Sequence, residues 1–351
     1  MKAKWIGLLL LIVVALGAVG YVWFSQTTQV TEITGYVGGE KIGLLEDEQV
    51  RKILKDKYRL SLDYNRAGSI EMVTTLDRAG QDFLFPSNQT ALELFEGEEG
   101  SPEKSQIVFN TPIVLYTHAA VAEALTAEGV FSQSGGVLTA DMEQLVELME
   151  SGAQWSDVGL PELYGSVTVG TTDPAKSNSG NMFAGLLANT LCGGVADESN
   201  LAEILPRLQN IFQKLGYMES SSSDLFDQFL KTGMGAKPLI AGYENQLLEF
   251  AVENPDTWEQ IKGDIVMMYP TPTVWSSHVY IALDEQGKKG TEALLDEDVQ
   301  RLAWEKHGFR TSNYETLEKG GGQAVEELAG EITRVVPVPD YPTMKRIIEG
   351  L

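Results

Sequence analysis

The chain has 351 residues, of which 43% are apolar and 35 are glycine, a composition typical of a globular protein with many turns. This length suits two ordinary domains or one large α/β unit. The formal net charge of −24 argues against a nucleic-acid partner, because phosphate backbones require a surplus of Lys and Arg.

The N-terminal segment is strongly apolar. Lys2 and Lys4 precede an uncharged stretch, residues 5–24, which reads WIGLLLLIVVALGAVGYVWF. As a helix, this stretch would extend about 30 Å, the thickness of the hydrocarbon core of a bilayer. The preceding lysines predict a cytoplasmic N-terminus and an exported remainder. Residues 1–25 are therefore expected to form a membrane anchor or, alternatively, a cleavable signal segment.

Strands and helices alternate after a short polar linker. Residues 31–39 read as a strand that runs into glycines, and residues 45–58 have helical spacing with acids early and lysines late. Residues 59–65 alternate like a strand. Residues 67–80 begin a helix behind Ser69, and residues 81–95 repeat the strand, turn and helix. This β-α-β-α-β order predicts a mostly parallel α/β sheet.

Two long β-rich stretches, residues 107–118 and 263–283, bracket a second region of alternating pattern. This layout predicts two lobes joined by two crossing strands. The first lobe is expected to comprise residues 31–115 and 278–351, and the second lobe residues 116–277. Ligands of such folds bind in the cleft where strand C-termini meet helix N-termini.

Four turns between strands and helices carry small polar residues: Gly38-Gly39, Ala67-Gly68-Ser69, Pro86-Ser87-Asn88 and Ser177-Asn178-Ser179-Gly180. Helix capping explains each turn taken alone. The same geometry also forms an anion site, because free N–H donors, hydroxyls and the positive end of a helix dipole converge there. Four such turns at the same end of consecutive units favour a ligand cleft.

The turn at residues 177–180 is the most informative of the four. Three polar side chains precede a helix that needs one cap, so two remain to be explained, and Gly180 would let the backbone approach a ligand or adopt a positive φ. Tyr243 lies between a predicted strand and a predicted helix. It either offers its hydroxyl to a ligand or packs in the core.

The remaining reactive side chains indicate no further chemistry. Cys192 has no cysteine to pair with and reads as a small buried residue. His118, His278 and His307 are far apart and lack ligand spacing, so neither a metal nor another cofactor is expected. No nucleophile–base pair can be assembled from the sequence, and an enzyme is therefore not expected.

The segments TTDPAKSNSGNMFAGLLAN, KPLIAGYENQLLEF and PTPTVWSSHVYIAL together resemble extracellular solute-binding proteins of the type 2 periplasmic-binding superfamily. The resemblance covers roughly residues 31–312 and is nearest the sulfate-, molybdate- and phosphate-binding branch. It implies a two-lobed α/β fold that closes on a small polar solute, often an oxyanion held by hydroxyls and amides. Together with Gly38 of the first turn, the matching positions form the predicted ligand site: Ser69, Ser87, Ser177, Asn178, Ser179 and Tyr243.

The resemblance and the apolar N-terminus together predict an extracytoplasmic protein tethered to the cell membrane. Its expected role is to deliver a small polar solute, with an oxyanion as one candidate, to an ABC permease. The alternative is a membrane-anchored scaffold or sensor that uses the same fold to bind a protein partner.

Overall fold

The computed structural model describes residues 29–134, 136–311, 325, 328–329, 332 and 334–351. The expected anchor or signal segment, residues 1–25, lies outside this part of the chain. Among the described residues, no helix has the length and apolar character needed to cross a membrane.

The first lobe is built around three parallel strands. β1 (Thr31–Val37) pairs with β2 (Leu60–Arg66) on one side and with β3 (Phe83–Phe85) on the other. The helices of this lobe are η1 (Gly39–Lys41), α2 (Ile42–Glu46), α3 (Glu48–Tyr58), α4 (Glu71–Thr74), α5 (Gln89–Glu99), α13 (Gly287–Leu294) and α14 (Glu297–Glu305). α3 begins where the Asp47 side chain accepts from the backbone N–H groups of Gln49 and Val50, as an N-cap does.

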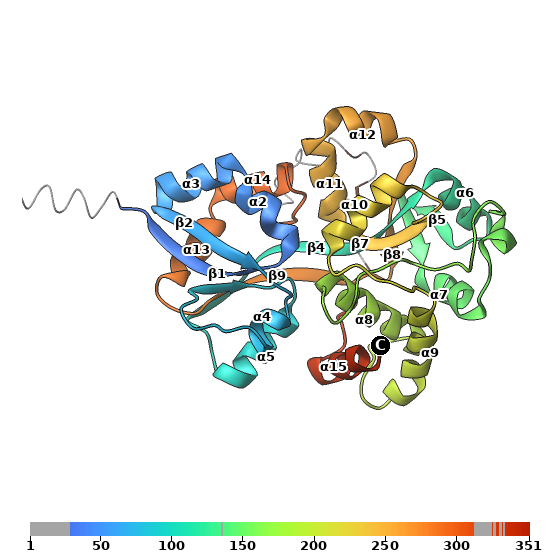
Figure 1. Ribbon diagram of the computed structural model, residues 1–351, viewed down its shortest axis with the longest axis horizontal. Helices are drawn as coiled ribbons and strands as arrows, with labels where there is room; N and C mark the ends of the chain where they lie inside the picture. The colour runs from blue at the N-terminus through green and yellow to red at the C-terminus, as the bar shows by residue number, and fades with distance from the viewer. Residues whose placement is uncertain (1–28, 135, 312–324, 326–327, 330–331, 333) are drawn as a thin grey trace, which may run out of the picture.

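Two long strands, β4 (Lys104–His118) and β9 (Trp275–Ala282), join the lobes (Figure 1). The first half of β4 pairs antiparallel with β9, and its second half pairs antiparallel with β7 (Leu239–Tyr243) and β8 (Ile265–Thr271). The alternating pattern predicts a mostly parallel sheet. The observed sheet is instead mixed, with both parallel and antiparallel pairs. The reason is that the chain leaves the first lobe along β4 and returns to it along β9.

The second lobe is completed by a hairpin and by helices that cover the sheet. β5 (Phe131–Ser134) pairs antiparallel with β6 (Val137–Asp141), which in turn runs parallel to β8. The helices of this lobe are α6 (Ala119–Ala127), α7 (Met142–Ser151), η2 (Trp155–Val158), α8 (Asn178–Cys192), α9 (Leu201–Gln213), α10 (Ser222–Thr232), α11 (Glu244–Glu253), α12 (Pro255–Ile261) and α15 (Tyr341–Gly350).

The buried apolar residues form separate cores on the two sides of the crossing strands. Two cores draw on residues 33–109 and 279–309, and two others draw on residues 113–274 and 325–347. The C-terminal helix departs from the expected division, which placed it in the first lobe. Met344 and Ile347 of α15 pack in the large core of the second lobe, beside α8 and α9 (Figure 1). The exact lobe boundaries remain predictions.

Helix α8 lies deep in the second lobe. Its sequence, NSGNMFAGLLANTLC, carries no charge, and 13 of its 15 residues are buried. Cys192, at its end, is half-buried against the same core. An uncharged helix can be buried on all sides without the cost of desolvating ions. This packing places the first turn of α8 at the junction between the lobes, where Asn178 contacts the Ser87 carbonyl.

Candidate functional site

A cavity of about 660 Å³ lies between the two lobes. The first lobe contributes the turns that follow β1 and β2, with residues 38–40, 66–71 and 74–75. The second lobe contributes the loop before α8, residues 175–178, and the start of α10, with residues 220–222 and Asp224. The cavity therefore lies where strands end and helices begin, the position at which α/β folds of this kind bind ligands.

Four of the seven predicted site residues line the cavity: Gly38, Ser69, Ser177 and Asn178. Ser69 is only 3% exposed, and its Oγ accepts from the backbone N–H of Ser87 at 2.9 Å. The other three, Ser87, Ser179 and Tyr243, are buried outside the lining. The predicted set thus contains both cavity residues and residues that support the cavity wall.

The Ser177 hydroxyl is not used to cap its helix. Ser177 occupies the N-cap position of α8 in an extended conformation, but its side chain makes no capping hydrogen bond. Its Oγ lies 3.1 Å from Ser179 Oγ, which in turn lies 2.8 Å from Thr172 Oγ1 in a buried contact. Ser177 therefore lines the cavity at the positive end of α8, whereas the Ser179 hydroxyl contacts the loop that precedes the helix.

Gly180 serves packing within its own lobe. A Cβ atom at this position would lie 2.1 Å from the carbonyl oxygen of Thr172, so a side chain cannot be accommodated there. Its φ is not among the positive values in the chain. The expectation of a positive φ at Gly180 is wrong, and the close neighbour of this glycine is the loop that precedes α8.

A second helix start faces the same cavity. Ser221 is the N-cap of α10 and accepts from the backbone N–H of Asp224 at 3.3 Å, while Ser220 and Ser222 line the cavity beside it. The serine run at 220–223 reads in sequence as a turn and cap, and Ser221 confirms the cap. The structure adds that the run lies at the cavity, together with the first turn of α8.

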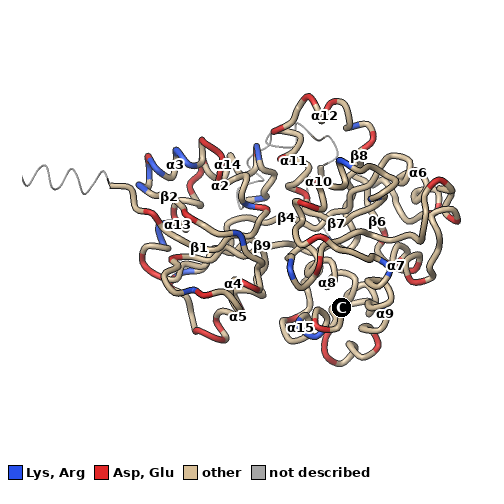
Figure 2. The backbone as a smooth tube through the Cα atoms, in the orientation of Figure 1, with Lys and Arg blue, Asp and Glu red and all other residues tan. Residues whose placement is uncertain are grey.

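The charged residues of the cavity have mixed signs. Arg66 and Lys176 supply positive charge, and Glu40, Glu71 and Asp224 supply negative charge. Lys176 is paired with Asp173 at 2.8 Å, and Glu71 accepts from the backbone N–H of Gly68 at 3.3 Å. Acidic side chains are otherwise spread over both lobes (Figure 2). A ligand here meets local donors and acceptors and not a field of one sign.

A network of ionisable side chains around Lys41 forms the wall of the cavity next to Gly38. The fully buried Lys41 places its Nζ 2.5 Å from Glu40 Oε1, 2.7 Å from Ser87 Oγ and 3.3 Å from His278 Nδ1. Ser87 Oγ also donates to Glu40. A Cβ atom on Gly38 would lie 2.7–2.8 Å from the side chains of Glu40, Ser87 and Lys41, so a larger residue at this turn would displace part of the network.

The network sets its own protonation states. Burial, helped by the Lys41 charge, lowers the pKa of His278 to about 4. Burial alone would raise the pKa of Glu40, but the Lys41 ammonium and His278 hold it well below its usual value. Burial also lowers the pKa of Lys41, against the pull of Glu40. At neutral pH the network is therefore an ion pair beside a neutral imidazole.

Asn178 fastens the two lobes together beside the cavity. Its Nδ2 donates to the Ser87 carbonyl at 3.0 Å and to the Tyr243 hydroxyl at 2.9 Å, and its Oδ1 accepts from Asn88. Ser276 Oγ also donates to the Ser87 carbonyl, at 2.5 Å. Tyr243 is thus a buried hydrogen-bond partner of Asn178. Of the two roles expected for Tyr243, this arrangement corresponds to packing in the core.

Several residues of the site escape prediction from sequence. Arg66 ends an ordinary strand, and Lys41 and Glu40 look like a solvated helix start. His278 lies in a β-rich run without any ligand spacing. The available signal was the pair of glycines before Glu40, which indicates close approach of other groups to the backbone. Nothing in the local pattern shows that these ions are buried.

No family model matches the chain, and no curated protein matches it. Solved structures do match over most of its length. A putative extracellular solute-binding protein from Bordetella parapertussis is 10% identical, with a TM-score of 0.57 over 91% of this chain and 97% of the other. The substrate-binding protein of an ABC transporter from Agrobacterium tumefaciens is 14% identical, with a TM-score of 0.55 over 93% and 94%.

A ferric binding protein from Campylobacter jejuni is 10% identical, with a TM-score of 0.56 over 91% of this chain and 95% of the other. At such identities the likeness establishes the fold. The chain shares the two-lobed α/β fold of these binding proteins, in agreement with the fold that its sequence motifs predict.

Proposed function

We propose that this protein is an extracytoplasmic solute-binding protein that holds a small polar solute between its lobes and delivers it to an ABC-type permease. The N-terminal segment would tether it to the membrane. The observation that carries this proposal is the cavity of about 660 Å³ between the lobes. In it, the Ser177 hydroxyl, which does not cap its helix, and the serines at the start of α10 lie opposite turns of the first lobe.

The lining favours a solute that carries an oxyanion group and further polar groups. Two helix starts, several hydroxyls and Arg66 supply donors for anionic oxygen. Glu71 and Asp224 can accept from hydroxyl or amino groups of the same solute. The volume lies within the range of pockets for small organic molecules, about 300–1,000 Å³. A phosphorylated or carboxylated organic solute therefore fits better than a bare inorganic ion.

Catalysis is not part of the proposal. Ser87 is the hydroxyl that contacts a lysine in this region, but both side chains are fully buried in the wall and Lys41 is held by Glu40. A substrate in the cavity would not reach the Ser87 oxygen.

A thermal-shift screen tests the function. The panel contains inorganic sulfate, molybdate and phosphate, organic phosphates and carboxylates, sugars and amino acids. A ligand that binds the folded form stabilises it by about 2.7 kcal/mol at one hundred times its dissociation constant, so a true solute raises the melting temperature clearly. If no compound shifts the melting temperature at millimolar concentration, the transport role is contradicted and the scaffold alternative is favoured.

Two serine variants test the site once a solute is found. Ser177→Ala and Ser222→Ala should each weaken binding about tenfold or more, because each removes a hydrogen bond to a charged group. Ser223→Ala is the matched control, since this serine of the same run lies outside the cavity lining, and its affinity should stay within about threefold. Calorimetric affinities unchanged in Ser177→Ala and Ser222→Ala would remove these helix starts from the binding site.

A further inference from the structure

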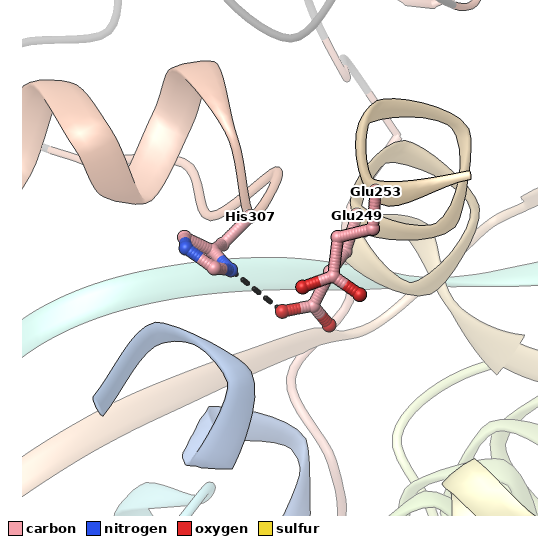
Figure 3. Close-up of side chains that lie close together, drawn as sticks. All are labelled: Glu249, Glu253 and His307. Carbon is pink, nitrogen blue, oxygen red and sulfur yellow. Dashed lines mark hydrogen bonds and ion pairs between the residues drawn. The ribbon is translucent and has the colours of Figure 1, made fainter. Parts of the chain in front are cut away.

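A second cluster of ionisable side chains lies where α11 meets the end of α14, outside the lining of the cavity (Figure 3). Glu249 and Glu253 stand one turn apart on α11, and both point towards His307. One carboxylate oxygen of each glutamate and a ring nitrogen of His307 lie within 4.8 Å of one another. His307 Nδ1 is 2.6 Å from Glu249 Oε1.

The cluster draws its members from both lobes. His307 follows α14, and its neighbours Ala303 and Phe309 pack in a core of the first lobe. Glu249 and Glu253 belong to α11, whose residues Leu248 and Ala251 pack in a core of the second lobe. Any ion bound by all three side chains would connect the lobes.

The imidazole has the surroundings of a metal ligand. His307 is 2% exposed, and its second ring nitrogen, Nε2, is buried without a hydrogen bond among the described residues. This nitrogen lies 3.5 Å from Asp47 Oδ2, which also accepts from Lys306 Nζ at 2.8 Å. Metal-binding histidines commonly donate their other ring N–H to a carboxylate, which orients the ring, and Asp47 is the carboxylate near enough to take that role after a small shift.

Negative charge is in excess at this position. Three carboxylates, those of Asp47, Glu249 and Glu253, gather around one ammonium group and one imidazole. A net negative charge remains even when His307 is protonated. A bound cation would relieve this crowding of like charges.

We propose that Glu249, Glu253 and His307 bind one divalent transition-metal ion, with Zn²⁺ the best match, and that Asp47 orients the imidazole. One imidazole and two carboxylates supply three ligands, and water completes a tetrahedral shell. Zinc ligands lie about 2.0–2.2 Å from the ion, so the exposed Glu253 side chain turns inwards on binding. The ion fastens α11 to the end of α14 and stabilises this arrangement of the lobes. The site is separate from the solute cavity of the proposed function.

Calorimetric titration of Zn²⁺ into the full-length chain in detergent, first stripped with a chelator, tests the proposal. Wild-type protein should bind one ion per chain and gain thermal stability. Because His307→Gln alters a buried side chain, the exposed Glu253 provides the safer variant, and Glu253→Gln should weaken binding at least about tenfold. Asp47→Asn keeps a residue that can cap α3 and should weaken binding about 10–100-fold.

Glu259→Gln is the matched control. Glu259 is an exposed glutamate on α12 that pairs with Lys262 and is not a member of the cluster, so its loss should leave zinc affinity unchanged. No saturable binding by wild-type protein at millimolar Zn²⁺ would overturn the proposal. Equal affinity in wild type, Glu253→Gln and Asp47→Asn would also overturn it. Solute binding is measured separately, in the presence of chelator. A failure of the zinc site can then be told apart from a failure of the proposed solute cavity.

Discussion

The ion pair between the fully buried Lys41 and Glu40, whose side chain is 7% exposed, lies in the cavity wall, and its neighbour His278 is fully buried. Burying a charge is costly unless it is paired and hydrogen-bonded, and Ser87 supplies the additional hydrogen bonds. A second positive charge on His278 would lie 3.3 Å from Lys41. Burial of the ring, together with this repulsion, keeps the imidazole neutral at pH values well below its usual pKa.

The neutral imidazole predicts a pH-dependent stability. The unfolded chain protonates His278 near pH 6.5, whereas the folded chain does so near pH 4. The contribution of neutral His278 to the free energy of unfolding is therefore fully present above pH 6.5. It is lost as the pH falls towards 4, because the unfolded state then binds more protons than the folded state. Between pH 7 and 4.5 the loss is about 2–3 kcal/mol.

Denaturant unfolding of wild type and His278→Gln at these two pH values checks this prediction. The variant should lose less stability on acidification than the wild type. Glu40 contributes in the same direction, but the unfolded chain protonates it only near pH 4.5, so most of that loss falls below the window and is shared by both proteins. An equal loss in both proteins would contradict a neutral, buried His278.

At the scale of the element, the first turn of α8 faces the cavity, and the loop that precedes α8 packs against this turn. Gly180 permits this contact, since a Cβ there would collide with the Thr172 carbonyl. Gly97 in α5 is also a helical glycine, but a Cβ there would meet no atom within 4 Å. Comparing substitutions at Gly180 and Gly97 therefore distinguishes the effect of close packing from the effect of helix propensity.

Alanine at the two positions should have opposite effects. Gly180→Ala should destabilise the protein by about 1–3 kcal/mol through overpacking. Gly97→Ala should stabilise it by up to about 1 kcal/mol through helix propensity. Chemical unfolding measures both differences. Stabilisation by Gly180→Ala of the same size as that by Gly97→Ala would show that the Thr172 contact does not constrain α8.

At the scale of the whole molecule, the lobes are held near each other by polar contacts as well as by the crossing strands. Asn178 links α8 to the Ser87 turn and to Asn88, both in the first lobe. Lobes of such folds open and close about a hinge when a ligand binds. Contacts of this kind bias the equilibrium in the absence of ligand by only a few kcal/mol.

Asn178→Ala should shift the solute-free protein towards a more open form, with a larger radius of gyration in small-angle X-ray scattering. Asn189→Ala is the matched control, because this buried amide in the same helix bonds Pro337 and Ala196 within the second lobe. Its radius of gyration should match the wild type. An unchanged radius in Asn178→Ala, or the same increase in both variants, would contradict a linking role for Asn178.

Much of the fold follows from the sequence because secondary structure depends on neighbours in the chain. The alternation of strand and helix up to residue 95 is visible in apolar periodicity, and the small residues of the turns at Gly38, Ser69 and Ser177 mark where helices begin at the cavity. The antiparallel pairing of β4 with β9 is not visible, because strand direction depends on the path of the chain between the lobes.

Tertiary packing decided what the site residues do. Ser177 and Ser179 differ by two positions, yet one lines the cavity and the other bonds Thr172, and sequence pattern cannot distinguish them. His307 has no ligand spacing in the chain and meets Glu249 only because α11 and the end of α14 pack together. Local pattern determines which elements form and where polar turns fall. Burial and encounters between residues distant in sequence arise only when the lobes assemble.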